Sequence, residues 1–135
     1  MMIVALDKDR QSNEKLGSML KQTMINHKYR YFTSISECID FVSNFEVSLV
    51  FLSKDIGHHP YDVQIVCHKL RKIKSDIDII LMGNDDKLNS SMALWSLKNR
   101  CSGYLCKPLE YEKLVSSLRN IWFNPILELD DLISF

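Results

Sequence analysis

The sequence predicts an α/β fold, in which a doubly wound five-stranded parallel sheet lies between two layers of helices. Two observations support this prediction. Short apolar or aromatic runs, typical of strands covered on both faces, recur along the 135 residues. Segments with apolar residues at helical spacing follow the runs. Such alternation builds a three-layer α/β/α sandwich around a parallel sheet.

The first half of the chain supplies three strands and two helices. Residues 2–6 form an unbroken apolar run, residues 29–33 a short aromatic strand, and residues 49–52 the run that we expect at the centre of the sheet. Ser12 can cap the first helix, and the capping box Ser34-Ile35-Ser36-Glu37 begins the second. The side chains predicted to face inward are Leu16, Met19, Leu20, Thr23, Met24, Ile39, Val42 and Phe45.

The second half continues the alternation. Strands are expected over residues 77–82 and 103–106. A third helix precedes the strand 77–82, a fourth helix connects the two strands, and a fifth helix follows the strand 103–106. We therefore predict one domain over residues 1–123, followed by a tail or the start of a linker over residues 124–135. The predicted inward side chains are Val63, Val66, Leu70, Ile73, Leu88, Met92, Trp95, Leu114, Val115, Leu118, Ile121 and Trp122.

The composition indicates a globular protein without a strong net field. Apolar residues make up 46% of the chain, and 17 basic and 17 acidic residues give a formal net charge of zero, which favours neither nucleic acid nor membrane as a partner. The N-terminal apolar run is too short for a signal peptide or a membrane span, so we expect a cytoplasmic location. Four scattered cysteines are interpreted as buried, reduced thiols, with a disulfide or metal framework as the alternative: Cys38, Cys67, Cys101 and Cys106.

Four short segments at the strand ends match one known family. They are residues 3–9, 48–53, 79–84 and 103–108, the last of which combines a glycine, an aromatic residue and a Lys-Pro pair. On these segments the chain resembles the receiver (CheY-like) domain of bacterial two-component response regulators, from residue 2 to about residue 123. The resemblance implies a flavodoxin-like sheet with strand order 2-1-3-4-5.

In that family, two acidic residues after the first strand and an aspartate ending the third strand hold magnesium, and that aspartate accepts a phosphoryl group. The resemblance aligns Asp7 with the first acidic position, but Lys8 with the second and Ser53 with the phosphoacceptor. An ammonium group repels a divalent cation and can instead neutralise Asp7 or Asp55. A serine without a neighbouring base is a poor phosphohistidine acceptor. We therefore expect magnesium binding to be lost.

The remaining signalling positions are divided. Gly83 stands where the family has a hydroxyl side chain for the phosphoryl group, whereas Lys107 and Tyr104 match the family's lysine and switch aromatic. By resemblance the Lys107–Pro108 peptide bond is cis and aims the lysine at the acidic cluster, where we expect a salt bridge to Asp7 or Asp9. The sequence thus predicts a degenerate pseudo-receiver, with the fold retained and the acyl-phosphate switch lost.

Two functions follow, and neither is enzymatic. The first is a phosphorylation-independent interaction module in signal transduction. By resemblance it docks a protein partner, or a second copy of itself, through the fourth helix, the strand 103–106 and the fifth helix. The second is a conventional input domain that is phosphorylated at an acidic residue such as Asp55 and controls an output domain, although Asp55 is expected to pair with Lys8 or Lys54. A nucleotide-binding enzyme ranks third, because no glycine-rich phosphate loop occurs.

Three further patterns receive a simple interpretation. The adjacent His58 and His59 are read as surface loop residues and not as metal ligands. The tail over residues 124–135 carries an amphipathic pattern, and we expect it to pack on its own domain or on a neighbouring chain, with a frayed end as the alternative. A basic face on the third helix is read as solvated and not as a nucleic-acid patch: His68, Lys69, Arg71, Lys72 and Lys74.

Overall fold

The computed structural model describes residues 1–84, 98 and 100–122, and within them nine elements in chain order. The five strands form one parallel sheet in the order β2-β1-β3-β4-β5. The predicted fold class is therefore confirmed, and so is the strand order that the resemblance implied. The elements are β1 (Met2–Leu6), α1 (Arg10–Gln22), β2 (Lys28–Phe32), α2 (Ile35–Asn44), β3 (Leu49–Ser53), α3 (Asp62–Ile73), β4 (Asp78–Gly83), β5 (Gly103–Cys106) and α5 (Tyr111–Trp122).

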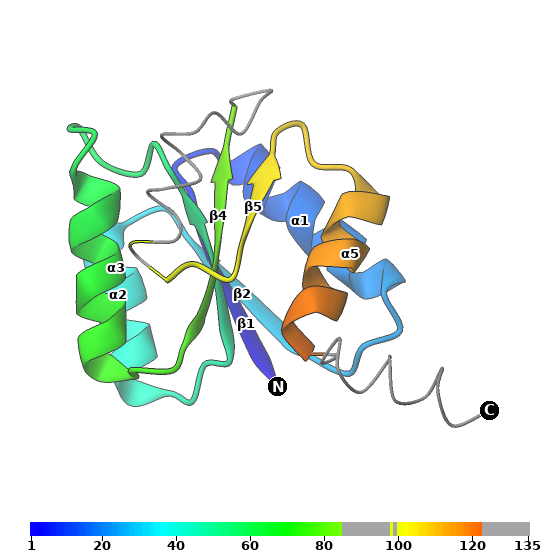
Figure 1. The fold of residues 1–135 in the computed structure, drawn as a ribbon, viewed down its shortest axis with the longest axis horizontal. Coiled ribbons are helices and arrows are strands. Elements are labelled where there is room, and N and C mark those ends of the chain that lie inside the picture. The colour runs from blue at the N-terminus through cyan, green and yellow to red at the C-terminus, as the bar shows by residue number, and fades with distance from the viewer. Residues whose placement is uncertain (85–97, 99, 123–135) are drawn as a thin grey trace.

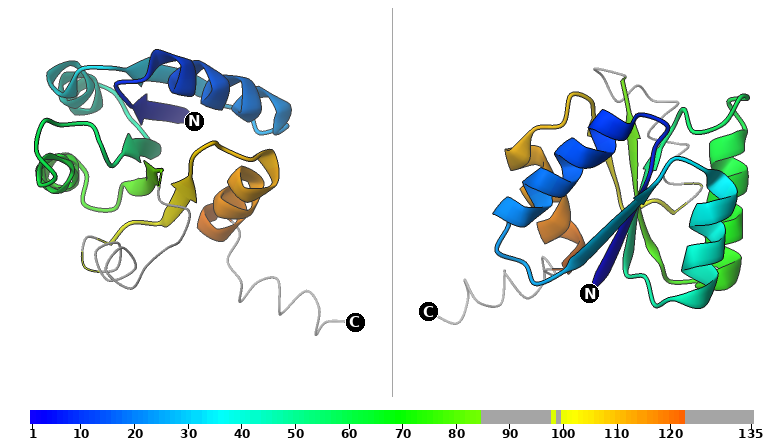
Figure 2. Two further views of the ribbon diagram at one scale, coloured as in Figure 1. Left: turned by 90° about the horizontal axis from the view of Figure 1, so that it is seen from above. Right: turned by 180° about the vertical axis from the view of Figure 1, so that it is seen from behind.

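Helices cover both faces of the sheet, as Figures 1 and 2 show. Helices α2 and α3 lie on one face, and α1 and α5 lie on the other. The strand β1 serves both layers, because alternate side chains point to opposite faces. Val4 and Leu6 join the core cluster under α2 and α3, whereas Ile3 and Ala5 join the cluster under α1 and α5. Each layer is thus held by apolar burial against the same central strands.

The strand β3 lies at the centre of the sheet, between β1 and β4. All five of its residues are buried, including Ser53 at its carboxyl end. This burial accounts for the unalternating sequence of the strand, since both of its faces are covered by helices. The predicted fourth helix, with Leu88, Met92 and Trp95, and the predicted tail over residues 124–135 lie outside the described residues. The domain boundary at residue 123 therefore stays a prediction.

The first helix begins earlier than the sequence suggested. Asp9, and not Ser12, is the N-cap of α1, and its carboxylate accepts hydrogen bonds from the backbone N–H groups of Gln11 and Ser12 at 3.0 and 3.4 Å. Asp9 is as good a cap as serine, so the residue type alone does not decide which one begins the helix. The cap predicted for α2 is confirmed, because the Ser34 hydroxyl accepts from the Glu37 N–H at 3.5 Å.

Three side chains predicted to face inward are instead exposed: Met24, Phe45 and Ile73. Met24 and Phe45 follow the last residues of α1 and α2, and Ile73 is the last residue of α3. The apolar stripe of a helix holds only while the chain stays helical, so side chains at and beyond the end leave the core. Phe45 stacks on Phe41 with ring centroids 4.5 Å apart. This contact keeps part of its ring covered.

The structure describes the state of the cysteines and the length of the helices. In the described part of the chain, all four cysteines are free thiols; Cys38 and Cys67 are buried, as expected, whereas Cys101 and Cys106 are half-buried. Over the same residues, none of the helices combines the length and the apolar character that crossing a bilayer requires. His58 and His59 are exposed on the loop before α3, as the sequence predicted.

Candidate functional site

The carboxyl ends of the central strands bring the predicted site residues to one edge of the sheet. The register pairs Leu6 of β1 with Leu52 of β3, and Gly83 of β4 with Cys106 of β5. Because all the strands are parallel, the residues that follow them meet at the same edge, which is where α/β proteins bind ligands. Four predicted residues from distant parts of the chain come together there: Asp7, Ser53, Gly83 and Lys107.

A buried ion pair joins the first and last strands at this edge. The Nζ of Lys107 lies 2.5 Å from the Oδ2 of Asp7, and the two side chains are 17% and 3% exposed. The other carboxylate oxygen of Asp7 accepts the Asp9 backbone N–H at 3.0 Å. The salt bridge predicted for Lys107 is thus formed with Asp7 and not with Asp9. The Lys107–Pro108 peptide bond is cis, as the resemblance implied.

Lys8 behaves differently from the prediction. Its side chain is exposed, and its Nζ donates to the carbonyl oxygen of Gly57 at 3.2 Å. Over the described residues, Lys8 therefore pairs with neither Asp7 nor Asp55. The reason is directional: Asp7 points into the sheet edge toward Lys107, whereas Lys8 points outward to the loop after β3. The prediction that Lys8 neutralises one of these carboxylates is wrong.

Ser53 is buried, with 2% of its surface exposed, at the carboxyl end of β3. Its hydroxyl oxygen accepts the backbone N–H of Asp55 at 3.4 Å. Among the described residues its hydrogen-bond partner is therefore a peptide group and not a base that could activate the hydroxyl. Asp55 itself is exposed on the loop that follows the strand.

Gly83 and Tyr104 form a contact that the sequence did not reveal. A Cβ atom placed on Gly83 would lie 2.6 Å from the hydroxyl oxygen of Tyr104. The ring of Tyr104 therefore packs inward over the end of β4, in the space that a side chain at position 83 would fill. From the resemblance alone, Gly83 is a position that lacks the family's hydroxyl side chain. In the structure, the absence of a side chain at Gly83 leaves room for the ring of Tyr104. The sequence does carry one signal for this contact: Gly83 directly follows one predicted strand, and the large aromatic side chain of Tyr104 lies on the neighbouring strand.

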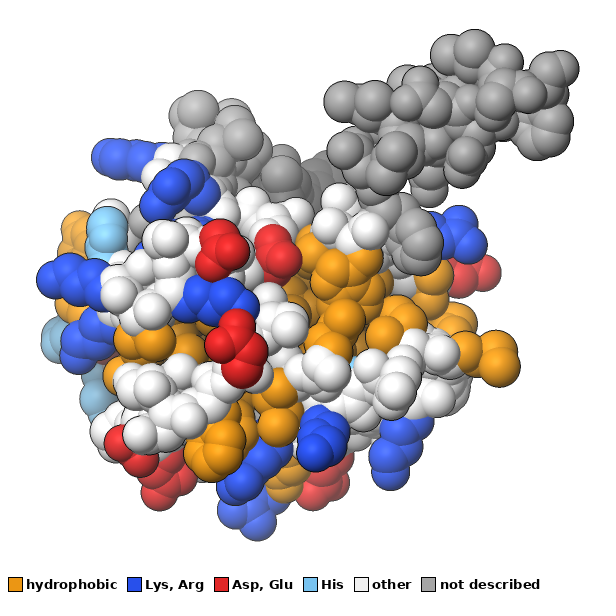
Figure 3. All heavy atoms as spheres, turned by 90° about the horizontal axis from the view of Figure 1, so that it is seen from below, with side chains coloured by type: hydrophobic (Ala, Val, Ile, Leu, Met, Phe, Trp, Pro, Cys, Tyr) orange, Lys and Arg blue, Asp and Glu red, His pale blue; other side chains and the backbone are white. Residues whose placement is uncertain are grey.

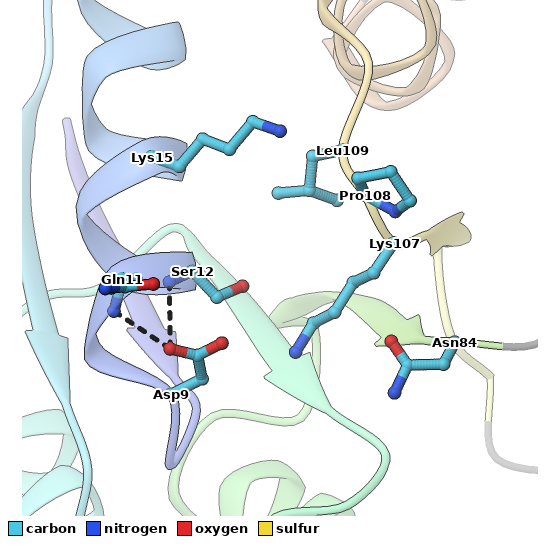
Figure 4. Close-up of a pocket in the computed structure, with 8 residues that line it drawn as sticks. All are labelled: Asp9, Gln11, Ser12, Lys15, Asn84, Lys107, Pro108 and Leu109. Carbon is cyan, nitrogen blue, oxygen red and sulfur yellow. Dashed lines mark hydrogen bonds between the residues drawn. The ribbon is translucent and has the colours of Figure 1, made fainter.

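A pocket of about 350 Å³ opens between the first turn of α1 and the loop after β5 (Figure 4). Lys107 reaches across it toward Asp9, and the dashed lines mark the hydrogen bonds by which Asp9 caps α1. Nothing in the sequence indicates that Lys15 and Asn84 line this space, because their position depends on how closely α1 approaches the loop after β5. The lining residues are Asp9, Gln11, Ser12, Lys15, Asn84, Lys107, Pro108 and Leu109.

The donor set at this edge does not fit magnesium, which prefers several oxygen ligands including carboxylates. Asp7 offers one carboxylate, and Lys107 and the Asp9 N–H occupy its two oxygens. The carboxylate of Asp9 accepts from the helix N-terminus. Across the residues that the structure describes, no three His, Cys, Asp or Glu side chains gather where they could share a metal ion.

Comparison with protein-family models and with curated proteins gives no match. Solved structures do match. A two-component response regulator from Clostridium difficile has a TM-score of 0.74 and 22% identity, covering 92% of this chain and 97% of that one. The chain has the receiver fold. A signal receiver domain from Clostridium thermocellum has a TM-score of 0.76 and 14% identity, covering 90% of this chain and 97% of that one.

A third match is the non-phosphorylated HemR receiver domain from Leptospira biflexa. Its TM-score is 0.74 at 16% identity, with 91% of this chain and 95% of that chain covered. The TM-scores establish that the receiver fold is shared, and at such low identities they establish the fold alone. The activity has to be argued from the residues at the sheet edge, since one fold carries many functions.

Proposed function

We propose that this chain is an atypical, degenerate receiver domain that acts in two-component signal transduction as a phosphorylation-independent protein–protein interaction module. The observation that carries the proposal is the packing of Tyr104 over Gly83. In the receiver domains that the chain resembles, the aromatic residue of the last strand takes inward or outward positions, coupled to a hydroxyl residue at the end of the fourth strand. Here the inward position needs no such hydroxyl and no phosphate.

The chemistry of the sheet edge supports the loss of phosphotransfer. An acyl phosphate forms on a carboxylate, and position 53 offers a buried serine hydroxyl bonded to a peptide group. The lysine that would stabilise phosphoryl oxygens, Lys107, is already paired with Asp7. Lys8 occupies the position of the second acidic residue, so that position offers no carboxylate to a metal ion, and its own side chain points outward to Gly57. Magnesium binding at Asp7 is accordingly absent in this proposal, and no other cofactor is required.

The proposed partner is a protein, or a second copy of this chain. The proposed surface comprises β5 and α5 together with the predicted fourth helix, which lies outside the described residues. Burial of apolar surface at such a face requires no covalent chemistry. In this proposal the protein is cytoplasmic and not an enzyme, and it binds neither membrane nor nucleic acid.

A conventional phosphoaccepting input domain is the alternative, with Asp55 as the acceptor and an output domain under its control. Its exposed position on the loop after β3 leaves Asp55 open to a phosphodonor. The local geometry favours this alternative less. Asp55 lies beyond the end of β3, and its backbone N–H donates a hydrogen bond to the hydroxyl of Ser53.

Incubation with acetyl phosphate and magnesium chloride, followed by intact-mass measurement, separates the two functions. We expect no phosphoryl adduct on the natural chain. The Asp55→Asn variant is the matched control, because an adduct that disappears in it would establish the alternative function. The Lys8→Asp/Ser53→Asp double variant is expected to bind magnesium by calorimetry before it gains phosphorylation, since Gly83 still lacks a hydroxyl. Sub-millimolar magnesium binding by the natural chain would contradict the proposal.

The self-association part of the proposal has its own measurement. Sedimentation velocity of the full chain, with and without acetyl phosphate, is expected to give the same distribution of masses. A distribution that changes with the phosphodonor would contradict phosphorylation independence.

A further inference from the structure

A second pocket, of about 190 Å³, lies between α3 and the segment that leads into β5. Cys67 of α3 reaches this pocket, and every other side chain that lines it is basic or a histidine. In Figure 3 the Lys, Arg and His side chains gather at the left edge of the molecule, which is the side of α3 in Figure 1. The lining residues are Cys67, His68, Arg71, Lys72, Lys98 and Arg100.

Two thiols meet beside this pocket. The Cys67 and Cys101 side chains are hydrogen-bonded to each other. Cys67 is 2% exposed, and Cys101 is half-buried and packs against the same core cluster. Far apart in the sequence, the two cysteines are brought together because α3 packs on the sheet next to the chain entering β5.

The environment of the two thiols is unequal. The hydrogen bond from Cys67, with help from the Arg71 guanidinium, lowers the pKa of the Cys101 thiol. The same hydrogen bond raises the pKa of the Cys67 thiol, and burial raises it further. A thiolate is the nucleophile in thiol chemistry, and Cys101 is half-buried whereas Cys67 is 2% exposed. Cys101 is therefore the member of the pair that meets an external reagent first.

The backbone around the pair is held in place by Arg71. Its guanidinium donates to the carbonyl oxygen of Ile77 at 3.1 Å and to that of Arg100. Arg100 has a φ of 55°, a left-handed conformation that non-glycine residues seldom adopt. This contact fixes both the positive charge and the residue before Cys101 against α3, which keeps the two thiols together.

We propose that Cys67 and Cys101 form a reversible disulfide by exchange with a small anionic disulfide, which the basic side chains of this pocket admit. The charge of the pocket selects the reagent, because a negatively charged disulfide gains favourable interactions there that a neutral one lacks. This modification site is separate from the proposed interaction function and does not depend on it.

The exchange proceeds in two steps. The Cys101 thiolate attacks one sulfur of the external disulfide, forms a mixed disulfide and releases the first external thiolate. Cys67 then loses its proton to water, and its thiolate attacks the Cys101 sulfur and releases the second external thiolate. Once Cys101 is a mixed disulfide, it no longer raises the pKa of Cys67 through their hydrogen bond; burial still raises that pKa, and Arg71 lowers it. The two cysteines are oxidised and the external disulfide is reduced to two thiols.

The other two cysteines serve as internal controls. Burial raises the pKa of the Cys38 thiol to about 12, so it stays protonated near neutral pH. Cys106 donates to the carbonyl oxygen of Lys107 at 3.6 Å, on the opposite end of β5 from the basic pocket.

The test uses the full chain, fully reduced and then treated with glutathione disulfide, which is anionic at neutral pH. Intact mass is expected to show the loss of two hydrogen atoms, and peptide mapping to recover a Cys67–Cys101 linked pair that dithiothreitol reverses. The Cys67→Ser variant is expected to accumulate the glutathione mixed disulfide on Cys101, and the Cys38→Ser variant to react like the natural chain. A mixed disulfide that stays on Cys101 of the natural chain, or a label on Cys106 alone, overturns the proposal.

The selectivity for an anionic reagent is tested with neutral 2-hydroxyethyl disulfide. At low salt we expect glutathione disulfide to react about tenfold faster, relative to its rate with free cysteine, and this advantage to fall as salt is added. The Lys72→Gln/Lys98→Gln variant removes two exposed charges from the pocket and leaves Arg71 in place, so it is expected to lose the same advantage. Equal rates for the two reagents would overturn the role of the basic pocket.

Discussion

At the scale of single residues, two contacts define the sheet edge: the packing of Tyr104 over Gly83 and the ion pair between Asp7 and Lys107. Gly83 has no positive φ, so its backbone conformation would accept a side chain. The constraint is the Tyr104 hydroxyl, 2.6 Å from where a Cβ would stand. A glycine here is therefore explained by packing against an aromatic ring and not by backbone conformation.

Restoring the hydroxyl residue by Gly83→Thr is expected to destabilise the protein by about 1–3 kcal/mol, because the new side chain overlaps Tyr104. Urea unfolding measures the change. In a Tyr104→Ala background the same substitution is expected to cost less, since the overlap is gone. Gly103→Ala is the matched control on the neighbouring strand, because the nearest atom to its Cβ is 3.9 Å away. Equal costs in both backgrounds would mean that Tyr104 does not restrict position 83.

Each charge of the buried Asp7–Lys107 ion pair neutralises the other, so removing one of them is expected to destabilise the fold. Lys107→Met leaves the Asp7 carboxylate, 3% exposed, without its cation, so we expect a loss of stability on the order of 3 kcal/mol. Adding Asp7→Asn is expected to recover part of that loss. Lys113→Met provides the control, because its 3.8 Å contact with Glu110 is exposed and worth about 0.5 kcal/mol or less. Similar losses for the two lysine variants, in chemical denaturation, would argue against the buried pair.

At the scale of elements, a cap decides where α1 begins and hence how its first turn faces the pocket. Asp9 satisfies the N–H groups of Gln11 and Ser12, and the helix runs from Arg10. This start places Ser12 and Lys15 against the loop after β5. The position of the cap therefore shapes the pocket, which Asp9 itself lines.

Asp9→Ala is expected to destabilise the fold by about 1 kcal/mol through the lost cap. Ser12→Ala, the cap that the sequence first suggested, is expected to change the stability by less than about 0.5 kcal/mol. Thermal unfolding followed by circular dichroism compares the two variants. A larger effect from Ser12 than from Asp9 would place the cap at Ser12 after all.

At the scale of the whole molecule, two apolar layers share one sheet, and the described part ends with α5 packed on the layer of α1. Leu114 and Leu118 of α5 are buried there, and Trp122 packs against the same cluster. The segment that follows, residues 124–135, is rich in leucine and isoleucine. Such a composition is too apolar for a flexible linker.

Deletion of the residues after Phe123 is expected to lower the melting temperature if the tail packs on its own domain, or to lower the mass in solution if it joins two chains. The reason is that an amphipathic stretch of this length is marginal alone in water and gains order only by burial. Calorimetry and light scattering on the full and shortened chains make the comparison. If neither quantity changes, the tail makes no stabilising contact.

The sequence by itself determined the strands and the class of fold. Unalternating runs such as residues 2–6 and 49–52 mark strands buried on both faces, and their bounds agree with β1 and β3 to within a residue. The cap at Ser34 was equally local and equally readable. The resemblance of the strand ends to the family also led us to expect a salt bridge from Lys107 to Asp7 or Asp9, and the structure forms the one to Asp7.

Only the tertiary structure decided the contacts between loops. It turned Lys8 toward Gly57, placed Tyr104 over Gly83, and brought the free thiols of Cys67 and Cys101 together beside a basic pocket. The physical reason is that periodicity records which face of an element is apolar, and this depends on neighbours in the sequence. The direction of a side chain at the end of a strand depends instead on register and on packing between segments that are distant in the chain.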